Sequence, residues 1–177
     1  NTMKDSTKFI FRGLVVAVAA SVLSFTAQAE ESRFSVNNPE PKEGQLIHVP
    51  PTMDDLDKSN MHPELKRVIR RGYDLFMNTQ QLRGKNVFNN MNCSSCHMGE
   101  GRLPFAGPVW PAVVTLPDYR GKNNHVNNLE ERIAGCFSFS MNGTPPEYGS
   151  DDMLALTAYH QWLAKGVPMY ADGKNMY

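Results

Sequence analysis

The sequence predicts an all-α domain. Three stretches repeat apolar residues at the three- and four-residue spacing of an amphipathic helix, and each is bounded by helix start or stop residues. These stretches are residues 63–76, residues 129–141, and the segment from Asp151 to just before Gly166. The chain of 177 residues is long enough for one domain of this kind.

The first 29 residues have the three parts of a secretory signal peptide. Basic residues come first, an apolar stretch follows at residues 13–26, and Ala27-Gln28-Ala29 forms a cleavage site. We expect Met3 to be the natural start, with the two preceding residues left over from expression. The apolar stretch is shorter than the roughly 20 residues that span a bilayer, so export to the periplasm is expected rather than a retained anchor. The basic residues are Lys4, Lys8 and Arg12.

Cleavage after Ala29 changes the formal charge from zero to −2, because it removes three basic residues and one acidic residue. A nearly neutral chain is not typical of nucleic-acid-binding proteins, and no membrane span is expected after cleavage. Residues 30–62 are rich in Pro, Asn and Asp without sustained periodicity, which predicts an irregular arm before a domain at 63–177. His48 lies in this arm and is expected to be solvated.

The first predicted helix begins at Pro63, because proline is favoured at the first position of a helix. Its apolar residues fall on one face. They are Leu65, Val68, Ile69, Tyr73 and Phe76. Residues 78–92 follow with one glycine and seven Asn or Gln residues, which predicts a loop.

The loop leads into a Cys-x-x-Cys-His pentapeptide formed by Cys93, Cys96 and His97. This spacing is the attachment pattern of c-type haem. Each thiol can form a thioether with a haem vinyl group, and His97 can bind the iron as the proximal ligand. A thioredoxin-like dithiol would need a βαβ context, and a zinc site would need a second pair of ligands, whereas only one further cysteine exists. One covalent haem c is therefore predicted.

Residues 98–108 contain three glycines and two prolines, which predicts an irregular loop around the proximal face of the haem. A backbone carbonyl often accepts the Nδ1 proton of a metal-binding histidine, and we predict that Pro104 supplies it. The apolar stretch Val109–Leu116, which contains Trp110, is placed against a haem edge, although core packing explains it equally well.

The second predicted helix, Leu129–Met141, follows several asparagines that can cap it. Asn142-Gly143 ends it. The last helix begins after Ser150, with two aspartates in its positively polarised first turn, and ends before Gly166. This last helix is expected to cross the first one and close the domain.

The second axial ligand of the haem remains open between Cys136, Met141, and Met153 or a histidine. Cys136 and Met141 are five residues apart, which is about 140° around a helix, so both cannot face one iron. Arg132 and Ser140 lie one turn before and after Cys136 and share its face. A cation beside a cysteine favours a thiolate ligand. Alternatively, Cys136 is a small buried apolar residue.

From about Val68 to Pro168 the chain resembles the haem-1 domain of thiosulfate dehydrogenase and the related catalytic cytochrome subunit of the sulfur-oxidising complex. The Arg-x-x-x-Cys and Ser-Met-Asn-Gly pieces around Cys136 are the most specific. Gly72-x-x-x-Phe76 also resembles the first helix of class I cytochromes c. The matching stretches are Arg71–Thr79, Met91–His97, Gly101–Phe105, Glu131–Phe137, Ser140–Gly143 and Trp162–Pro168.

The resemblance implies a class I cytochrome c-like fold with crossing N- and C-terminal helices. It implies that Cys136 is the distal haem ligand and handles the substrate sulfur, that Arg132 is a substrate-binding cation, and that Arg120 is a weaker match to a second one. The implied reaction joins two thiosulfate ions into tetrathionate, or reverses this step, with another cytochrome or redox enzyme as the electron partner.

Two departures from the family pattern favour a different interpretation. Members often carry an arginine shortly after the cysteine, where this chain has Ser138 and Phe139. Characterised thiosulfate dehydrogenases also have a second haem domain, whereas this chain has one haem motif. The alternative function is therefore a non-catalytic electron-transfer cytochrome with His97 and Met141 at the iron. A third hypothesis is a structural subunit docked through the arm at residues 30–62.

Overall fold

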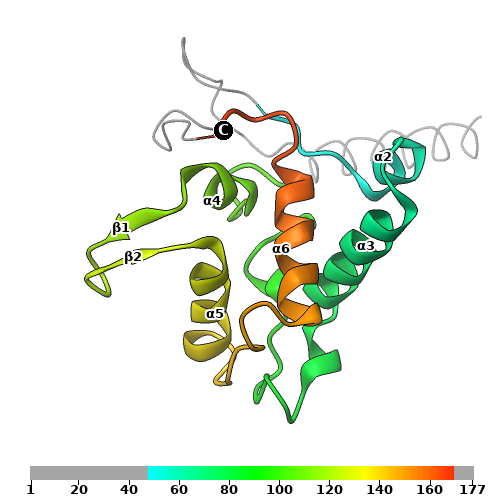
Figure 1. Cartoon of the computed structure of the whole chain (residues 1–177). Helices are drawn as coiled ribbons and strands as arrows, with labels where there is room; N and C mark the ends of the chain where they lie inside the picture. The colour runs from blue at the N-terminus through cyan, green and yellow to red at the C-terminus, as the bar shows by residue number, and fades with distance from the viewer. Residues whose placement is uncertain (1–47, 170–177) are drawn as a thin grey trace, which may run out of the picture. The chain divides into compact units, whose positions relative to one another are not determined.

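Two helices, α3 (Pro63–Met77) and α6 (Asp151–Leu163), cross at the centre of the computed structural model, which describes residues 48–169 (Figure 1). The predicted signal peptide and residues 30–47 of the predicted arm lie outside the described residues. The other elements are α2 (Met53–Lys58), the 3-10 turns η1 (Thr79–Leu82) and η2 (Cys93–Ser95), α4 (Trp110–Thr115), β1 (Asp118–Arg120), β2 (His125–Asn127) and α5 (Leu129–Phe139).

The three predicted helices are confirmed, and their ends follow the expected capping chemistry. Pro63 occupies the first position of α3, and the His62 side chain caps that helix. Asn128 and Glu131 form a capping box at α5, in which each side chain accepts a hydrogen bond from the other residue's backbone N–H, at 2.9 and 2.8 Å. The Ser150 side chain caps α6.

The crossing of α3 and α6 depends on the missing side chain of Gly72. A Cβ atom at this position would lie 1.9 Å from the Ala155 carbonyl oxygen and 2.8 Å from Tyr159 Cβ. Only glycine allows the two backbones to approach this closely. The predicted crossing of the N- and C-terminal helices is therefore confirmed, as the expected cytochrome c-like fold requires, although a small two-stranded sheet adds to the helices.

Two apolar clusters lie on either side of this crossing. One joins α2, α3, α4 and α6, and the other joins α3, α5, α6 and the loop at residues 82–87. The first contains Leu56, Ile69, Phe76, Val109, Trp110, Val114, Ala158, Tyr159, Trp162, Leu163 and Ala164. The second contains Leu75, Leu82, Val87, Ile133, Ala134, Phe137, Met141, Met153, Ala155 and Leu156. Among residues 48–169, no helix is long and apolar enough to cross a bilayer.

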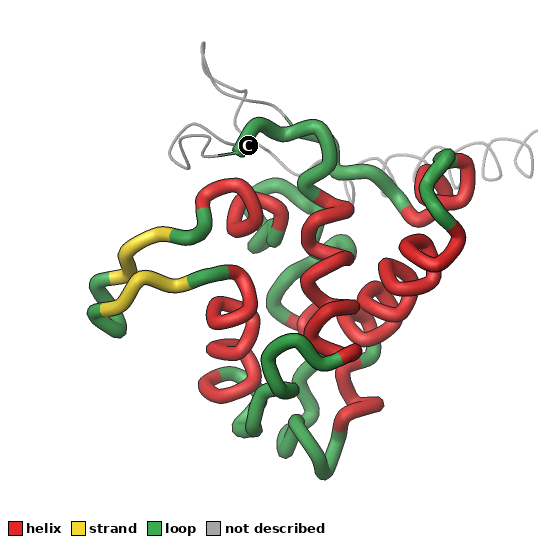
Figure 2. The backbone as a smooth tube through the Cα atoms, in the orientation of Figure 1, coloured by secondary structure: helices red, strands yellow, loops and turns green. Residues whose placement is uncertain are grey.

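Two short helices and a two-stranded hairpin were not predicted. α2 forms inside the segment expected to be irregular, and it places Leu56 in the first apolar cluster. α4 forms within the apolar stretch 109–116. β1 and β2 pair antiparallel, with Tyr119 opposite Val126, and this hairpin connects α4 to α5 (Figure 2).

The expectation of a solvated His48 is wrong. Its Nε2 atom lies 2.7 Å from the Leu163 carbonyl oxygen, at the end of α6. Its ring packs edge-on against Trp110, with 4.7 Å between ring centroids. The segment around His48 is therefore packed on the helical core.

We predict that Gly72→Val lowers the free energy of unfolding by about 3 kcal/mol or more, because the added atoms overlap backbone that no rotamer change can move. Denaturant unfolding of the haem-loaded protein measures this change. Gly121→Val is the matched control, since an added Cβ at Gly121 meets nothing within 4 Å, and its effect is expected to stay within about 0.5 kcal/mol. Equal stabilities of the two variants would contradict the role assigned to the crossing.

Candidate functional site

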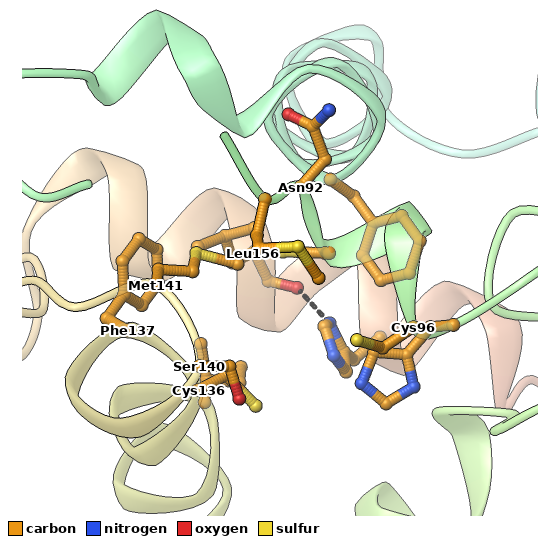
Figure 3. Close-up of a pocket in the computed structure, with 13 residues that line it drawn as sticks. Asn92, Cys96, Cys136, Phe137, Ser140, Met141 and Leu156 are labelled. Atoms are coloured by element: carbon orange, nitrogen blue, oxygen red, sulfur yellow. Dashed lines mark hydrogen bonds between the residues drawn. The ribbon is translucent and has the colours of Figure 1, made fainter. Parts of the chain in front are cut away.

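A cavity of about 490 Å³, including its open mouth, is lined by residues of both apolar clusters, mostly of the second. Its walls come from α3, the segment at residues 91–97, α5 and α6, and most of its lining side chains are apolar or carry sulfur. Figure 3 shows Cys136 of α5 and Ser140, the residue after that helix, on one side and Cys96 on the other. The lining residues are Phe76, Met91, Asn92, Cys93, Cys96, His97, Ile133, Cys136, Phe137, Ser140, Met141, Leu156 and His160.

The haem motif forms one tight turn on the cavity wall. The backbone N–H groups of Cys96 and His97 both donate to the Cys93 carbonyl, at 3.2 and 3.0 Å. The Thr79 hydroxyl accepts a hydrogen bond from the Cys93 N–H at 3.0 Å and lies 3.4 Å from its sulfur. Burial raises the pKa of the Cys93 thiol to about 11. Both motif cysteines line the same cavity.

The side chain of His97, the predicted proximal ligand, contacts Gly107, so the prediction that Pro104 supplies this carbonyl is wrong. His97 Nδ1 lies 2.5 Å from the Gly107 carbonyl oxygen. Gly107 has φ +71°, and a Cβ there would lie 3.0 Å from the Cys96 carbonyl oxygen and 3.2 Å from His97 Nδ1. Glycine thus permits the close approach. Donation from Nδ1 leaves the Nε2 lone pair available for a metal.

The opposite wall brings together the three residues predicted to share a face of the second helix. Arg132 Nη1 lies 3.8 Å from Cys136 Sγ, and Ser140 lines the same cavity one turn later. Met141 also lines the cavity, with 2% of its surface exposed, whereas Met153 is fully buried in the second apolar cluster. The candidates for the second axial ligand that line this cavity are therefore Cys136, Met141 and one histidine.

That histidine, His160 of α6, was not singled out from the sequence. It is 7% exposed, and its Nδ1 lies 2.8 Å from the Leu156 carbonyl oxygen, one turn earlier. Burial lowers the pKa of His160 to about 4, so the imidazole is neutral at neutral pH. The sequence could have indicated a buried His160 through its spacing, because it falls four residues after Leu156 on an otherwise apolar helix face.

A second cavity of about 380 Å³, including its open mouth, shares four residues with the first and adds a cationic side chain. The shared residues are His97, Ile133, Cys136 and His160. Arg132 lines only the second cavity, so the Cys136 sulfur lies where an apolar space meets a cationic one. Within residues 48–169, Arg120 lies at the end of β1 and is not among the residues lining either cavity.

These residues fit a covalent haem. Two thiols on one turn can bind one macrocycle, and an adjacent imidazole with its Nδ1 already engaged can bind the iron. The apolar walls suit the ring. The candidate ligands opposite the haem motif are the thiol of Cys136 on α5 and the thioether of Met141, which follows the end of α5.

Comparison with known proteins agrees with this site. The chain matches the SoxA/TsdA cytochrome c domain over residues 78–169. It is 43% identical over 125 residues to a thiosulfate dehydrogenase of Stutzerimonas stutzeri, covering 71% of this chain and 39% of that protein. It is 35% identical over 157 residues to a thiosulfate dehydrogenase of Thiomonas intermedia, covering 89% and 48%.

A solved structure, the as-isolated form of thiosulfate dehydrogenase (TsdBA) from Marichromatium purpuratum, superposes with a TM-score of 0.66 at 36% identity. The match covers 76% of this chain and 29% of that chain. The chain thus spans less than half the length of the curated relatives named above. The chain belongs to the SoxA/TsdA cytochrome c domain family, whose covalent cofactor is haem c.

Proposed function

We propose that this chain is a periplasmic c-type cytochrome with thiosulfate dehydrogenase or tetrathionate reductase chemistry at a haem held by His97 and Cys136. The observation that carries the proposal is the place of Cys136. Its thiol lies on the wall opposite the haem motif, 3.8 Å from a guanidinium nitrogen of Arg132. The names of the two curated relatives and of the solved structure support the substrate class.

Four residues would hold the haem. Cys93 and Cys96 would form the thioethers, His97 would bind the iron from the proximal side, and Cys136 would bind it from the distal side. When bound, the haem supplies a one-electron acceptor, so a two-electron oxidation of sulfur also needs a separate redox partner. Another cytochrome or redox enzyme is the class of partner proposed.

Arg132 would bring the anionic substrates to the sulfur of Cys136. Joining two thiosulfate ions places two dianions in contact, and two unit charges about 4 Å apart repel by about 4 kcal/mol at an effective dielectric of about 20. A guanidinium can also donate two hydrogen bonds to one oxyanion. Arg120 is proposed as a second cation, which would act from the hairpin rather than from the cavity wall.

Cys136 would carry the substrate sulfur covalently. In the oxidative direction, the Cys136 thiolate and the outer sulfur of one thiosulfate form an S–S bond, and two electrons leave the pair. The outer sulfur of a second thiosulfate then attacks the sulfur bound to Cys136. Tetrathionate departs and the thiolate is restored, so two thiosulfate ions yield one tetrathionate and two electrons.

The alternative function is a non-catalytic electron carrier with Met141 at the iron. Two observations favour it. Met141 lines the cavity, and a methionine thioether raises the potential as an electron shuttle requires. In addition, Phe139 is 90% exposed at a place where family members often carry an arginine, so it brings no positive charge to the substrate.

The identity of the distal ligand separates these functions. We predict that Cys136→Ala abolishes thiosulfate-dependent reduction of an acceptor and changes the ferric low-spin EPR spectrum, because it removes both the sulfur carrier and the ligand. Met141→Leu, which nearly conserves volume, should leave both properties unchanged. A near-infrared methionine-to-iron band in the wild-type protein that Met141→Leu removes would overturn the proposal in favour of the electron carrier.

The role of Arg132 is tested separately. We predict that Arg132→Gln lowers kcat/KM for thiosulfate by about 10- to 100-fold, because a charged hydrogen bond contributes about 1.5–3 kcal/mol. Steady-state kinetics at low ionic strength measures the change, and Arg132→Lys should restore part of the loss. Arg67→Gln is the control, since Arg67 is paired with Glu64 on the surface of α3, at 2.6 Å. Similar losses in the Arg132→Gln and Arg67→Gln variants would exclude a specific role for Arg132.

A further inference from the structure

An N-terminal strap, residues 48–52, lies against the end of α6. Figure 1 shows this cyan segment passing close to the red end of the described chain. Besides the His48 contact with the Leu163 carbonyl, the Trp162 indole N–H donates to the Thr52 carbonyl at 3.2 Å. Pro50, between these two contacts, is buried. The strap is thus part of the packed structure on both sides of Pro50.

Arg102 connects this strap to the loop that follows the haem motif, which we call the proximal loop (residues 98–107). Two nitrogens of its guanidinium, Nε and Nη2, donate to the Pro50 carbonyl at 3.1 and 2.8 Å. The Arg102 side chain is 26% exposed, and its third nitrogen lies 3.7 Å from the Glu100 carboxylate. A forked contact of this kind fixes both the distance and the direction of the side chain.

The proximal loop is also tied to α3 and α6 through Glu100. The Tyr73 hydroxyl donates to the Glu100 carboxylate at 3.0 Å, and the Tyr159 hydroxyl donates to the Glu100 carbonyl at 2.7 Å. Burial, with the charge of Glu100 nearby, raises the pKa of Tyr159, so this hydroxyl remains a donor. The loop therefore has one anchor on the helices and a second on the strap.

These anchors hold a backbone that would otherwise relax. Glu100 and Phe105 have φ values of 62° and 59°, which residues other than glycine rarely adopt. Such conformations persist only where surrounding contacts determine them. The loop ends at Gly107, whose carbonyl lies 2.5 Å from His97 Nδ1. A change in the loop backbone is thereby transmitted to the proximal ligand.

We propose that Arg102 is a positioning residue for the haem, because its clamp on the Pro50 carbonyl fixes the loop whose Gly107 carbonyl orients His97. The N-terminal strap then belongs functionally to the haem site. This inference rests on the proposed role of His97 as an iron ligand and is independent of the thiosulfate chemistry.

The expected consequence is a change in the redox equilibrium. A hydrogen bond from Nδ1 makes the imidazole a stronger electron donor, which stabilises ferric iron. Loosening the loop weakens this bond and favours the ferrous state. Arg102→Met retains the apolar stem but removes every donor, so it should shift the ferric–ferrous equilibrium toward ferrous by about three- to tenfold, less than the effect of losing a direct partner of the ligand.

The test uses the haem-loaded full chain without thiosulfate. Spectroelectrochemical titration gives the equilibrium, and EPR g values of the ferric protein report on the axial ligands. Arg102→Lys, which retains one point donor, should show a smaller shift in the same direction. Lys66→Met is the matched control, because Lys66 Nζ also binds backbone carbonyls near the N-terminus of the described chain, those of Asp57 at 3.0 Å and Ser59 at 2.5 Å, but does not contact the proximal loop.

The control variant should lose stability while keeping the wild-type equilibrium and g values. A wild-type equilibrium in either folded Arg102 variant would overturn the inference. So would an equal shift in Lys66→Met, since that result would assign the effect to general loosening of the fold. No measurement here depends on substrate turnover. A negative result for Arg102 would therefore leave the proposed thiosulfate chemistry unaffected. Conversely, the role of Arg102 can still be tested if the thiosulfate chemistry is disproved.

Discussion

The contact between Gly72 and the backbone of Ala155 is the constraint on which the other features depend. It sets the distance between α3 and α6 and so fixes the positions of Phe76 and Leu156. These two residues belong to different apolar clusters, and both line the cavity. Interiors packed at this density do not deform continuously. A change at the crossing would therefore move the cavity walls together, although Cys93, Cys96, His97 and Cys136 lie on neither helix.

The haem motif and Cys136 lie in different surroundings within the site. The haem motif lies on an extensively hydrogen-bonded turn. The sulfur of Cys136, which we propose to be reactive, lies on α5, next to a cavity with a cationic wall. An apolar environment on one side and a guanidinium on the other would let one sulfur serve either the metal or an anion. Met141 is buried in the second apolar cluster and does not line the cavity that contains Arg132.

Much of the fold could be predicted from the sequence, because α3, α5 and α6 are long, periodic and capped by their own flanking residues. The short α2 and α4 could not, since each has six residues and depends on tertiary packing. Sequence spacing also does not show which carbonyl of the loop reaches His97. The answer, Gly107 rather than Pro104, depends on how a loop with several positive φ angles folds back on itself. Arg102 and His160 acquire their roles from partners distant in the sequence or from burial, so their importance emerged only from the structure.

The anchors of the proximal loop also bear on the order of folding. Tyr159 reaches Glu100 across 59 residues of sequence, and His48 reaches Leu163 across 115. Contacts this distant along the chain close late and slow the folding of a domain. The haem motif, by contrast, is a local turn. We therefore expect the turn of the pentapeptide to form early and the contacts that fix the loop around His97 to be completed when the last helix docks.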